Sequence, residues 1–345
     1  MKNRKKHLMR MIAAIVTVAS IYTFAPWKAG VYYFAPLPST IQDQVDDTVK
    51  QGLDGIIVYI QKEGQKAELY ASGWHNRDKK IAAQPNALFK IASIGKLYNA
   101  SAVAKLVARE RISLDKTLSD YLPSLAGRIE YAEQITLRMM VQHRSGIPNY
   151  TDHDDFSWSE RTIGGDRNLR SILDTPADFK PGSDYGYSNT NYLLLAKIMT
   201  KVLGYDHRQY IKENILAPLG LKRTFFSINE IGDEELMSGY YVGYDADFKD
   251  LDQGYIASAE DVGIFLRALN DGTLFTEKEQ EIYGSIYEYE HTGWVLGYYS
   301  IARYHKDIDT VVIQFVNTVG DNTLTLTDVA YERIIRILRM RDEKT

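Results

Sequence analysis

The chain has 345 residues and an ordinary globular composition, with 45% hydrophobic residues, 25% charged residues and a net charge of −4. This small negative charge provides no basic field, so a nucleic-acid partner is not expected. Cysteine is absent, which excludes disulfides, thiolate catalysis, thiolate metal sites and a lipoprotein anchor.

The N-terminal segment has the pattern of an export signal or of a signal anchor. Its first ten residues, MKNRKKHLMR, include five Lys or Arg, and residues 11–27 carry no charge. The apolar stretch is short beside the roughly 20 residues of a membrane span, and its cleavage signals are weak. A cleaved signal and a retained anchor therefore both stay open, with a buried N-terminal helix as a third interpretation. We expect residues 1–38 to form this segment and a linker, and residues 39–345 to form one folded domain.

Hydrophobic periodicity predicts strands at both ends of this domain and helices between them. An amphipathic helix over Ile41–Lys50 precedes two strands within Gly55–Trp74. The part over about residues 93–281 reads as helices and loops. One antiparallel sheet from the N- and C-terminal strands, packed by helices, is the economical α+β arrangement. The C-terminal patterns predict three strands and a last helix, over Ile286–His291, Leu296–Tyr304, Thr310–Asn317 and Thr325–Met340.

The first candidate motif is Ser93-Ile94-Gly95-Lys96, at the start of an apolar helix. Residues three apart share one face of a helix, so Lys96 would lie beside Ser93. A serine hydroxyl is a weak nucleophile that needs a base, and a neutral lysine can serve. The alternative is a lysine whose ammonium group reaches out to water.

The second candidate motif is Tyr187-Ser188-Asn189, in a polar turn before another helix. A tyrosine beside Lys96 would ionise more easily and could carry protons, while the amide of Asn189 could hold a substrate carbonyl. The alternative interpretation is an ordinary helix cap formed by Ser188 or Asn189.

The third candidate motif is His291-Thr292-Gly293, which the periodicity places at the end of a strand. Gly293 would let a substrate backbone approach closely, and the amide of Trp294 could pair with that of Ser93 as an oxyanion hole. His291 could contact a substrate carboxylate or the tyrosine, or could be an ordinary histidine at a wet strand edge.

One acidic stretch, Thr151 to Phe156, could suggest a metal site. It lacks the ligand spacing of a calcium loop, so a solvated loop is expected there. Neither a metal nor a cofactor is predicted from the sequence.

In this order, the three motifs resemble the S-x-x-K, Y-x-N and H-x-G pattern of the serine β-lactamase and penicillin-binding protein superfamily. The resemblance is to its class C branch, which also holds D-alanyl-D-alanine carboxypeptidases, D-aminopeptidases and esterases. It covers residues 41–317 or beyond. The fold that it implies is the β-lactamase/transpeptidase-like fold. Three further stretches carry the likeness: LRMMVQHRSGIPNY, APLGLKRTFF and GYIASAEDVGIFLRALNDG.

The resemblance also implies roles for single residues. Ser93 would be the acylated nucleophile, Lys96 its base and Tyr187 the second proton carrier. Asn189 would position the substrate amide. His143 is expected to be structural. The edge strand that binds the acyl chain would include His291, Thr292 and Gly293, with oxyanion N–H groups from Ser93 and Trp294.

Three functions fit these residues. The first is an exported bacterial D-alanyl-D-alanine carboxypeptidase, anchored to the outer face of the cytoplasmic membrane or secreted, acting on peptides such as peptidoglycan stem peptides. The second is an esterase with the same machinery. The third is a sensor that binds β-lactams or cell-wall fragments with little turnover. His291 stands where many β-lactamases have lysine, and such relatives are more often peptidases or esterases.

Overall fold

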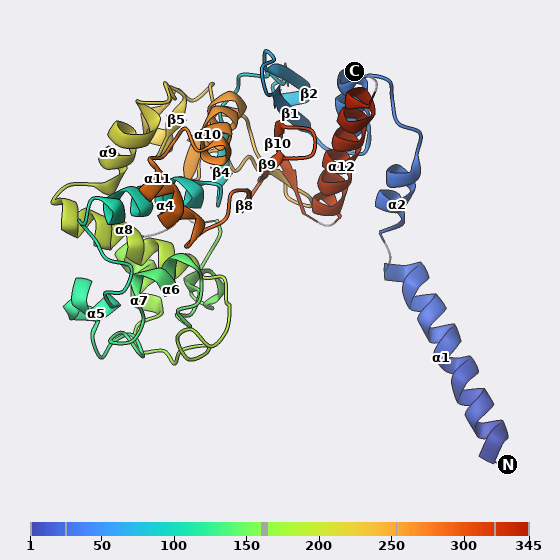
Figure 1. The fold of residues 1–345 in the computed structure, drawn as a ribbon. Helices are drawn as coiled ribbons and strands as arrows, with labels where there is room; N and C mark the ends of the chain where they lie inside the picture. The colour runs from blue at the N-terminus through green and yellow to red at the C-terminus, as the bar shows by residue number, and fades with distance from the viewer. Residues whose placement is uncertain (1, 25, 160–164, 253, 321, 344–345) are drawn as a thin grey trace.

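The N- and C-terminal strands share one antiparallel sheet, as the sequence predicts (Figure 1). The computed structural model describes residues 2–24, 26–159, 165–252, 254–320 and 322–343. Within these residues, six strands form a sheet in the order β3-β2-β1-β10-β9-β8. The N-terminal strand β1 and the C-terminal strand β10 therefore pair in the middle of the sheet. These strands are β1 (Gly55–Lys62), β2 (Glu68–Asn76), β3 (Ile81–Ala82), β8 (His291–Val295), β9 (Tyr298–His305) and β10 (Thr310–Val316).

Helices cover both faces of this sheet. The central pair β1 and β10 is joined in register from Ile56 opposite Val316 to Lys62 opposite Thr310. One face packs against α3 (Ile41–Lys50) and α12 (Thr323–Asp342). The other face packs against α10 (Ala259–Asp271) and the helical part of the chain. The α+β prediction is therefore confirmed.

Local sequence explains where the covering helices begin. The Thr40 side chain accepts a hydrogen bond from the Asp43 amide and caps α3, whose bounds match the predicted helix. The Ser258 side chain caps α10 in the same way, and Gly272 ends that helix with φ of 84°. On α12, the buried Arg333 donates to main-chain carbonyls of residues 32, 35 and 36, which ties α2 (Trp27–Phe34) to the domain.

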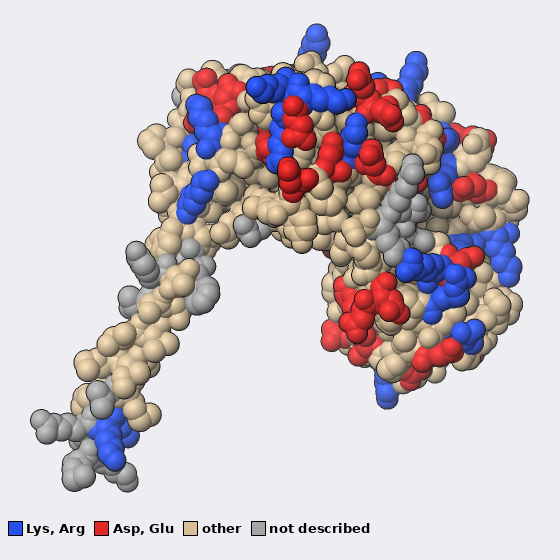
Figure 2. Space-filling view, turned by 180° about the vertical axis from the view of Figure 1, so that it is seen from behind, with Lys and Arg blue, Asp and Glu red and all other residues tan. Residues whose placement is uncertain are grey.

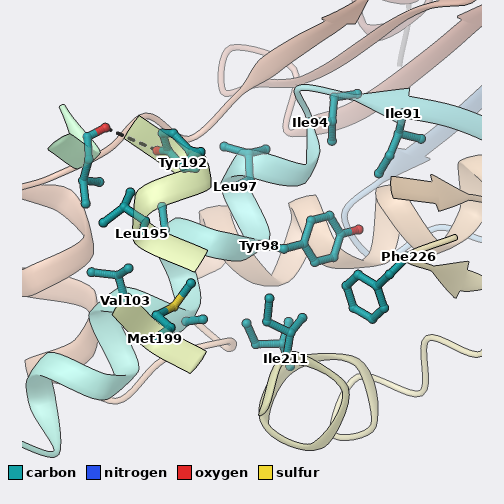
Figure 3. Close-up of a cluster of buried hydrophobic side chains, with 14 of the residues drawn as sticks. Ile91, Ile94, Leu97, Tyr98, Val103, Tyr192, Leu195, Met199, Ile211 and Phe226 are labelled. Atoms are coloured by element: carbon teal, nitrogen blue, oxygen red, sulfur yellow. Dashed lines mark hydrogen bonds between the residues drawn. The ribbon is translucent and has the colours of Figure 1, made fainter. Parts of the chain in front are cut away.

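The predicted helical part lies, in the sequence, between the N-terminal and C-terminal strands of the sheet. It is built around two packed helices, α4 (Gly95–Ala108) and α8 (Asn189–Leu203). Figure 3 shows their apolar side chains meeting in the core, including Leu97 and Tyr98 of α4 and Leu195 of α8. The remaining helices are α5 (Leu118–Tyr121), η1 (Pro123–Leu125), α6 (Leu137–Val141), η2 (Tyr150–Asp152), α7 (Asp166–Ser171), α9 (His207–Ile211), η3 (Lys212–Leu216), η4 (Ile228–Glu230) and α11 (Glu277–Gly284).

Two small sheets complete the described chain. One has the order β4-β7-β5 and the other pairs β11 with β6. The first matters for the site because β4 runs directly into the residues before α4. Their strands are β4 (Phe89–Ala92), β5 (Thr224–Phe225), β6 (Tyr240–Tyr241), β7 (Tyr255–Ala257) and β11 (Thr318–Val319).

The N-terminal helix α1 (Lys2–Phe24) projects away from the rest of the molecule (Figure 1). Lys and Arg gather at its far tip, whereas the face of the domain in Figure 2 mixes basic and acidic side chains. Among the described residues, no helix is both long and apolar enough to cross a membrane.

One predicted strand is wrong. Residues 286–290 form no strand, and β8 begins at His291 instead of ending there. The alternating tyrosines of this stretch belong to turns, because the amides of Ile286 and Tyr287 both bond to the carbonyl of Tyr283 at the end of α11. The Tyr283 hydroxyl also donates to the Glu288 carbonyl, which closes the turn on itself.

Candidate active site

Ser93 lies in a tight turn between β4 and α4. The turn starts at Ala92, whose φ of 47° is in the left-handed region that non-glycine residues rarely adopt. The Ile94 amide bonds to the Ile91 carbonyl at 3.1 Å, and the Lys96 amide to the Ser93 carbonyl at 3.0 Å. The buried strand and helix hold this strained turn, and they present the serine hydroxyl at the head of the helix.

Lys96 reaches the serine, as the i, i+3 spacing predicts. Its Nζ donates to Ser93 Oγ at 3.1 Å and to Asn189 Oδ1 at 2.8 Å. The lysine is only 8% exposed, so the alternative of an ammonium group extended into water is wrong. Among the described residues its hydrogen-bond partners are a hydroxyl and an amide.

Tyr187 completes the contacts of the serine hydroxyl. Its own hydroxyl donates to Ser93 Oγ at 2.8 Å, and its ring lies 4.9 Å from Lys96 Nζ. The tyrosine is 37% exposed, and Ser93 is itself partly exposed. Ser93 Oγ thus lies between two groups that can accept or return a proton.

Asn189 lies at the first position of α8, and its side chain faces Lys96. Its amide group donates to Asn149 Oδ1 at 3.3 Å and to Thr151 Oγ1 at 3.4 Å. Ser188 precedes the helix but makes no capping bond, since its hydroxyl donates to the Pro148 carbonyl instead. The helix-cap interpretation of this motif is therefore wrong.

The ring of His143 packs against the ring of Tyr187. The two rings stack with centroids 4.5 Å apart, and His143 Nδ1 accepts a hydrogen bond from the Ser188 amide at 3.1 Å. Burial, together with the nearby Lys96 and His291, lowers the pKa of His143 to about 3. The neutral ring carries its proton on Nε2, which has no hydrogen-bond partner among the described residues. These contacts agree with the structural role expected for His143.

The strand β8 brings His291 and Gly293 to the same site. The His291 ring lies 6.5 Å from that of Tyr187, and burial lowers the pKa of His291 to about 4. A Cβ on Gly293 would lie 2.2 Å from the Ile91 carbonyl oxygen, so only glycine allows β8 to approach the serine turn this closely. Strand alternation directs the Thr292 side chain to the opposite face, so Thr292 can reach a substrate only through its backbone.

A family model described as Beta-lactamase matches residues 39–335. The chain belongs to the beta-lactamase family. It is therefore a member of a serine hydrolase family, and the resemblance seen in its motifs is confirmed. The matched range contains every candidate site residue named above.

This beta-lactamase family chain is also similar to known proteins and to solved structures. Protein flp of Staphylococcus aureus (strain MW2) is 29% identical over 212 residues, which are 59% of this chain but only 42% of that protein. The D-amino acid amidase of Ochrobactrum anthropi SV3 has a TM-score of 0.76 at 21% identity, covering 87% of this chain and 98% of the amidase. The penicillin binding protein of Bacillus halodurans has a TM-score of 0.72 at 19% identity, covering 85% and 99%. At these identities, the two structures confirm the predicted fold and nothing further.

Two cavities of this beta-lactamase family chain are lined by the two residues that bond to Ser93 Oγ. One, of about 290 Å³, is lined by Lys96, Asn189, Tyr150 and residues of α8. The other, of about 300 Å³, is lined by Tyr187, His291 and residues of the segment after α11. A substrate carbonyl at Ser93 could therefore place its two substituents in separate cavities. Among the described residues, no group of three or more acidic or histidine side chains could hold a metal ion.

Several residues of the site were not predicted from the sequence. Asn149 and Thr151 hold the amide of Asn189. Asn149 lies within the family-like stretch LRMMVQHRSGIPNY, and this position could have indicated its role. Arg144 lines the cavity beside His291, and nothing in its spacing marks it. Trp158 touches Trp294 with ring centroids 4.8 Å apart, a long-range contact that no local pattern reveals.

The lowered pKa of His143 predicts a loss of stability in acid. Its ordinary pKa of 6.5 in the unfolded chain lies above the folded value of about 3. Between these values the unfolded chain binds more protons, so the free energy of unfolding falls as pH falls through this window. We expect His143→Asn to remove up to about 1.4 kcal/mol per pH unit of this dependence, the limit for one proton.

Urea unfolding at pH 4, 5, 6 and 7 measures this effect. Equal slopes for wild type and His143→Asn would contradict the assigned burial of a neutral imidazole.

Proposed function

We propose that this chain is a hydrolase that acts through an acyl-enzyme on Ser93, and that its reaction is of the D-alanyl-D-alanine carboxypeptidase type. The observation that supports the acyl-enzyme most strongly is the position of Ser93 Oγ, 3.1 Å from Lys96 Nζ and 2.8 Å from the Tyr187 hydroxyl. Both distances are within the range for proton transfer. A nucleophile with a base on each side is the arrangement that acyl transfer requires.

The proposed reaction has two halves. Lys96 takes the serine proton as Oγ bonds to the substrate carbonyl carbon, and the carbonyl oxygen becomes an oxyanion. Tyr187 carries a proton to the leaving nitrogen as the carbon–nitrogen bond breaks. In the second half, the Tyr187 oxygen regains a proton from water as the water oxygen bonds to the acyl carbon. Lys96 then returns its proton to Ser93 Oγ as the ester bond breaks, which frees Ser93. The amides of Ser93 and Trp294 are the proposed oxyanion donors, and the close packing of Gly293 on Ile91 keeps those two segments together.

A carboxypeptidase must also hold the terminal carboxylate of its substrate. His291 is a weak candidate for this, because with a pKa of about 4 it is neutral at pH 7. Arg144 lines the same cavity as Tyr187 and His291, and its guanidinium can bind a carboxylate through two hydrogen bonds. Glu288 also lines that cavity, and its negative charge would repel the substrate carboxylate. Binding therefore requires that the attraction of Arg144 exceed this repulsion.

The neutral His291 favours a second candidate function, an esterase. Short acyl esters have no carboxylate, so they need no fixed positive charge beside the serine. The cavity beside Tyr187 would then receive an uncharged leaving group. The catalytic steps at Ser93 are the same for both candidates, and the substrate alone distinguishes them.

The proposed location is outside the cytoplasmic membrane, with the N-terminal segment as an export signal or a membrane anchor. The support is the basic start of the chain followed by the uncharged residues 11–27. The projection of α1 away from the domain would leave the Ser93 site free of the membrane surface (Figure 1). A substrate in the cell envelope, such as a peptidoglycan stem peptide, would be accessible there.

A substrate panel tests the proposal. Purified full-length protein is assayed with an acetylated D-Ala-D-Ala peptide, p-nitrophenyl acetate and a penicillin, and the products are quantified. Release of D-alanine as the fastest reaction supports the carboxypeptidase, and faster ester hydrolysis supports the esterase. A stable penicillin adduct without turnover of the other two would indicate a sensor. Reaction with none of the three would contradict the proposed function.

A further inference from the structure

Four aromatic rings form a continuous contact from one wall of the site to the other. The ring of Tyr150 lies 5.5 Å from that of Phe156, which lies 5.0 Å from that of Trp158. Trp158 in turn lies 4.8 Å from Trp294, with the rings at 72°. We call these four residues the aromatic strap. Each contact has the edge-to-face geometry that stabilises aromatic pairs.

The two ends of the strap both lie near the turn that carries Ser93. Tyr150 lines the cavity that contains Lys96 and Asn189. Trp294 follows Gly293, which packs directly on the turn before Ser93. The strap therefore spans from the wall formed by α8 to the strand β8.

The contact at Trp294 also crosses the open edge of the main sheet. β8 is the last strand in the sheet order, and its Gly293 and Val295 face the helical core. Trp294 lies between them and points to the other face, whereas Trp158 packs on the core side. Contact between the two rings thus wraps the edge of β8, where an extended substrate chain would add as another strand.

The contact between Trp158 and Trp294 is weakened by an unpaired hydrogen-bond donor. The Trp294 indole N–H is buried and has no hydrogen-bond partner among the described residues. A buried unpaired donor is unfavourable by about 1–3 kcal/mol. Opening the strap would return this N–H to water or offer it to a ligand, so the closed state is only moderately stabilised.

Building on the proposed function, we propose that the aromatic strap selects the length of the acyl group. In the closed state the acyl group extends along β8 only as far as Gly293. A short acyl group, such as acetyl or a single D-alanyl residue, fits without disturbing the strap. A longer chain reaches Trp294 and must first separate it from Trp158. The preferred substrates are accordingly small D-amino acid derivatives or short esters, and a long stem peptide enters at the expense of this contact.

The test compares acyl lengths in wild type, Trp158→Ala and Trp74→Phe, with p-nitrophenyl acetate, butyrate and octanoate as substrates. Trp74 is an exposed tryptophan on β2 and serves as the matched control. In wild type and the control, kcat/KM is expected to fall at least about tenfold from acetate to octanoate. Trp158→Ala is expected to keep the acetate rate and to raise the octanoate rate about tenfold, within the range for added methylenes in a pocket. Trp294→Ala is expected to raise the octanoate-to-acetate ratio likewise.

A binding measurement separates this inference from the proposed function. Calorimetric titration with octanoate in the Ser93→Ala background needs no catalysis, and adding Trp158→Ala is expected to tighten binding about tenfold, or about 1.4 kcal/mol. If wild type reacts with none of the three panel substrates but octanoate binding tightens, the proposed function fails and the strap stands. The same octanoate affinity and the same ester-length profile with and without Trp158 would overturn the strap.

Discussion

Replacing Ser93 with alanine is expected to reduce turnover of every substrate by at least about 10⁴-fold, in the range found when a serine nucleophile is removed. The reason is that Oγ is the only atom that both Lys96 and Tyr187 contact through hydrogen bonds among the described residues. Without it, neither base has a nucleophile to activate. The measurement is kcat with the best substrate of the panel, and KM is expected to change little because the cavity walls remain.

A second serine provides the matched control. Ser285 lines the cavity beside Tyr187, is exposed and bonds to the Ile282 carbonyl. Ser285→Ala is therefore expected to retain the wild-type rate. Retention of activity in Ser93→Ala would mean that a different group forms the acyl-enzyme, or that none forms.

Replacing Tyr187 with phenylalanine is expected to lower kcat by about 10²–10⁴-fold, the usual contribution of a positioned acid–base group. The change removes only the hydroxyl that donates to Ser93 Oγ. The ring can keep its stacking on His143 and its position over Lys96, so the fold should persist. The measurements are kcat and the pH–rate profile, because loss of a proton carrier alters both.

Tyr185 is the control for this substitution. It lines the same cavity and is 54% exposed, but its hydroxyl does not contact Ser93. Tyr185→Phe should preserve the rate and the pH profile. If Tyr187→Phe also preserved them, the tyrosine would be a wall of the site without a role in proton transfer.

The sequence predicted most of the fold because its signals are local. The helix Ile41–Lys50 follows from a capping threonine and an apolar face, and its observed bounds are the predicted ones. The buried strand β10 follows from its β-branched run. The strand predicted before His291 is wrong for a local reason too. Alternating tyrosines have the pattern of a strand, but here they form turns around Tyr283.

The candidate site was predicted where a motif fixes short-range geometry. Ser93 and Lys96 are placed by one helix turn, and the resemblance to a known family indicated that Tyr187 and Asn189 would join them. What the sequence could not provide depends on tertiary burial. The neutral state of His291 and the contact between Trp158 and Trp294 arise from residues far apart in the chain.

Acylation of Ser93 can be measured by intact-protein mass spectrometry after incubation with a fluorescent penicillin, followed by peptide mapping. Wild type and Ser93→Ala are treated in parallel. We expect a mass gain of one acyl group in wild type, mapped to the peptide that contains Ser93, and no gain in Ser93→Ala. An equal gain in both proteins, or an adduct on another residue, would contradict the assignment of Ser93 as the acylated nucleophile.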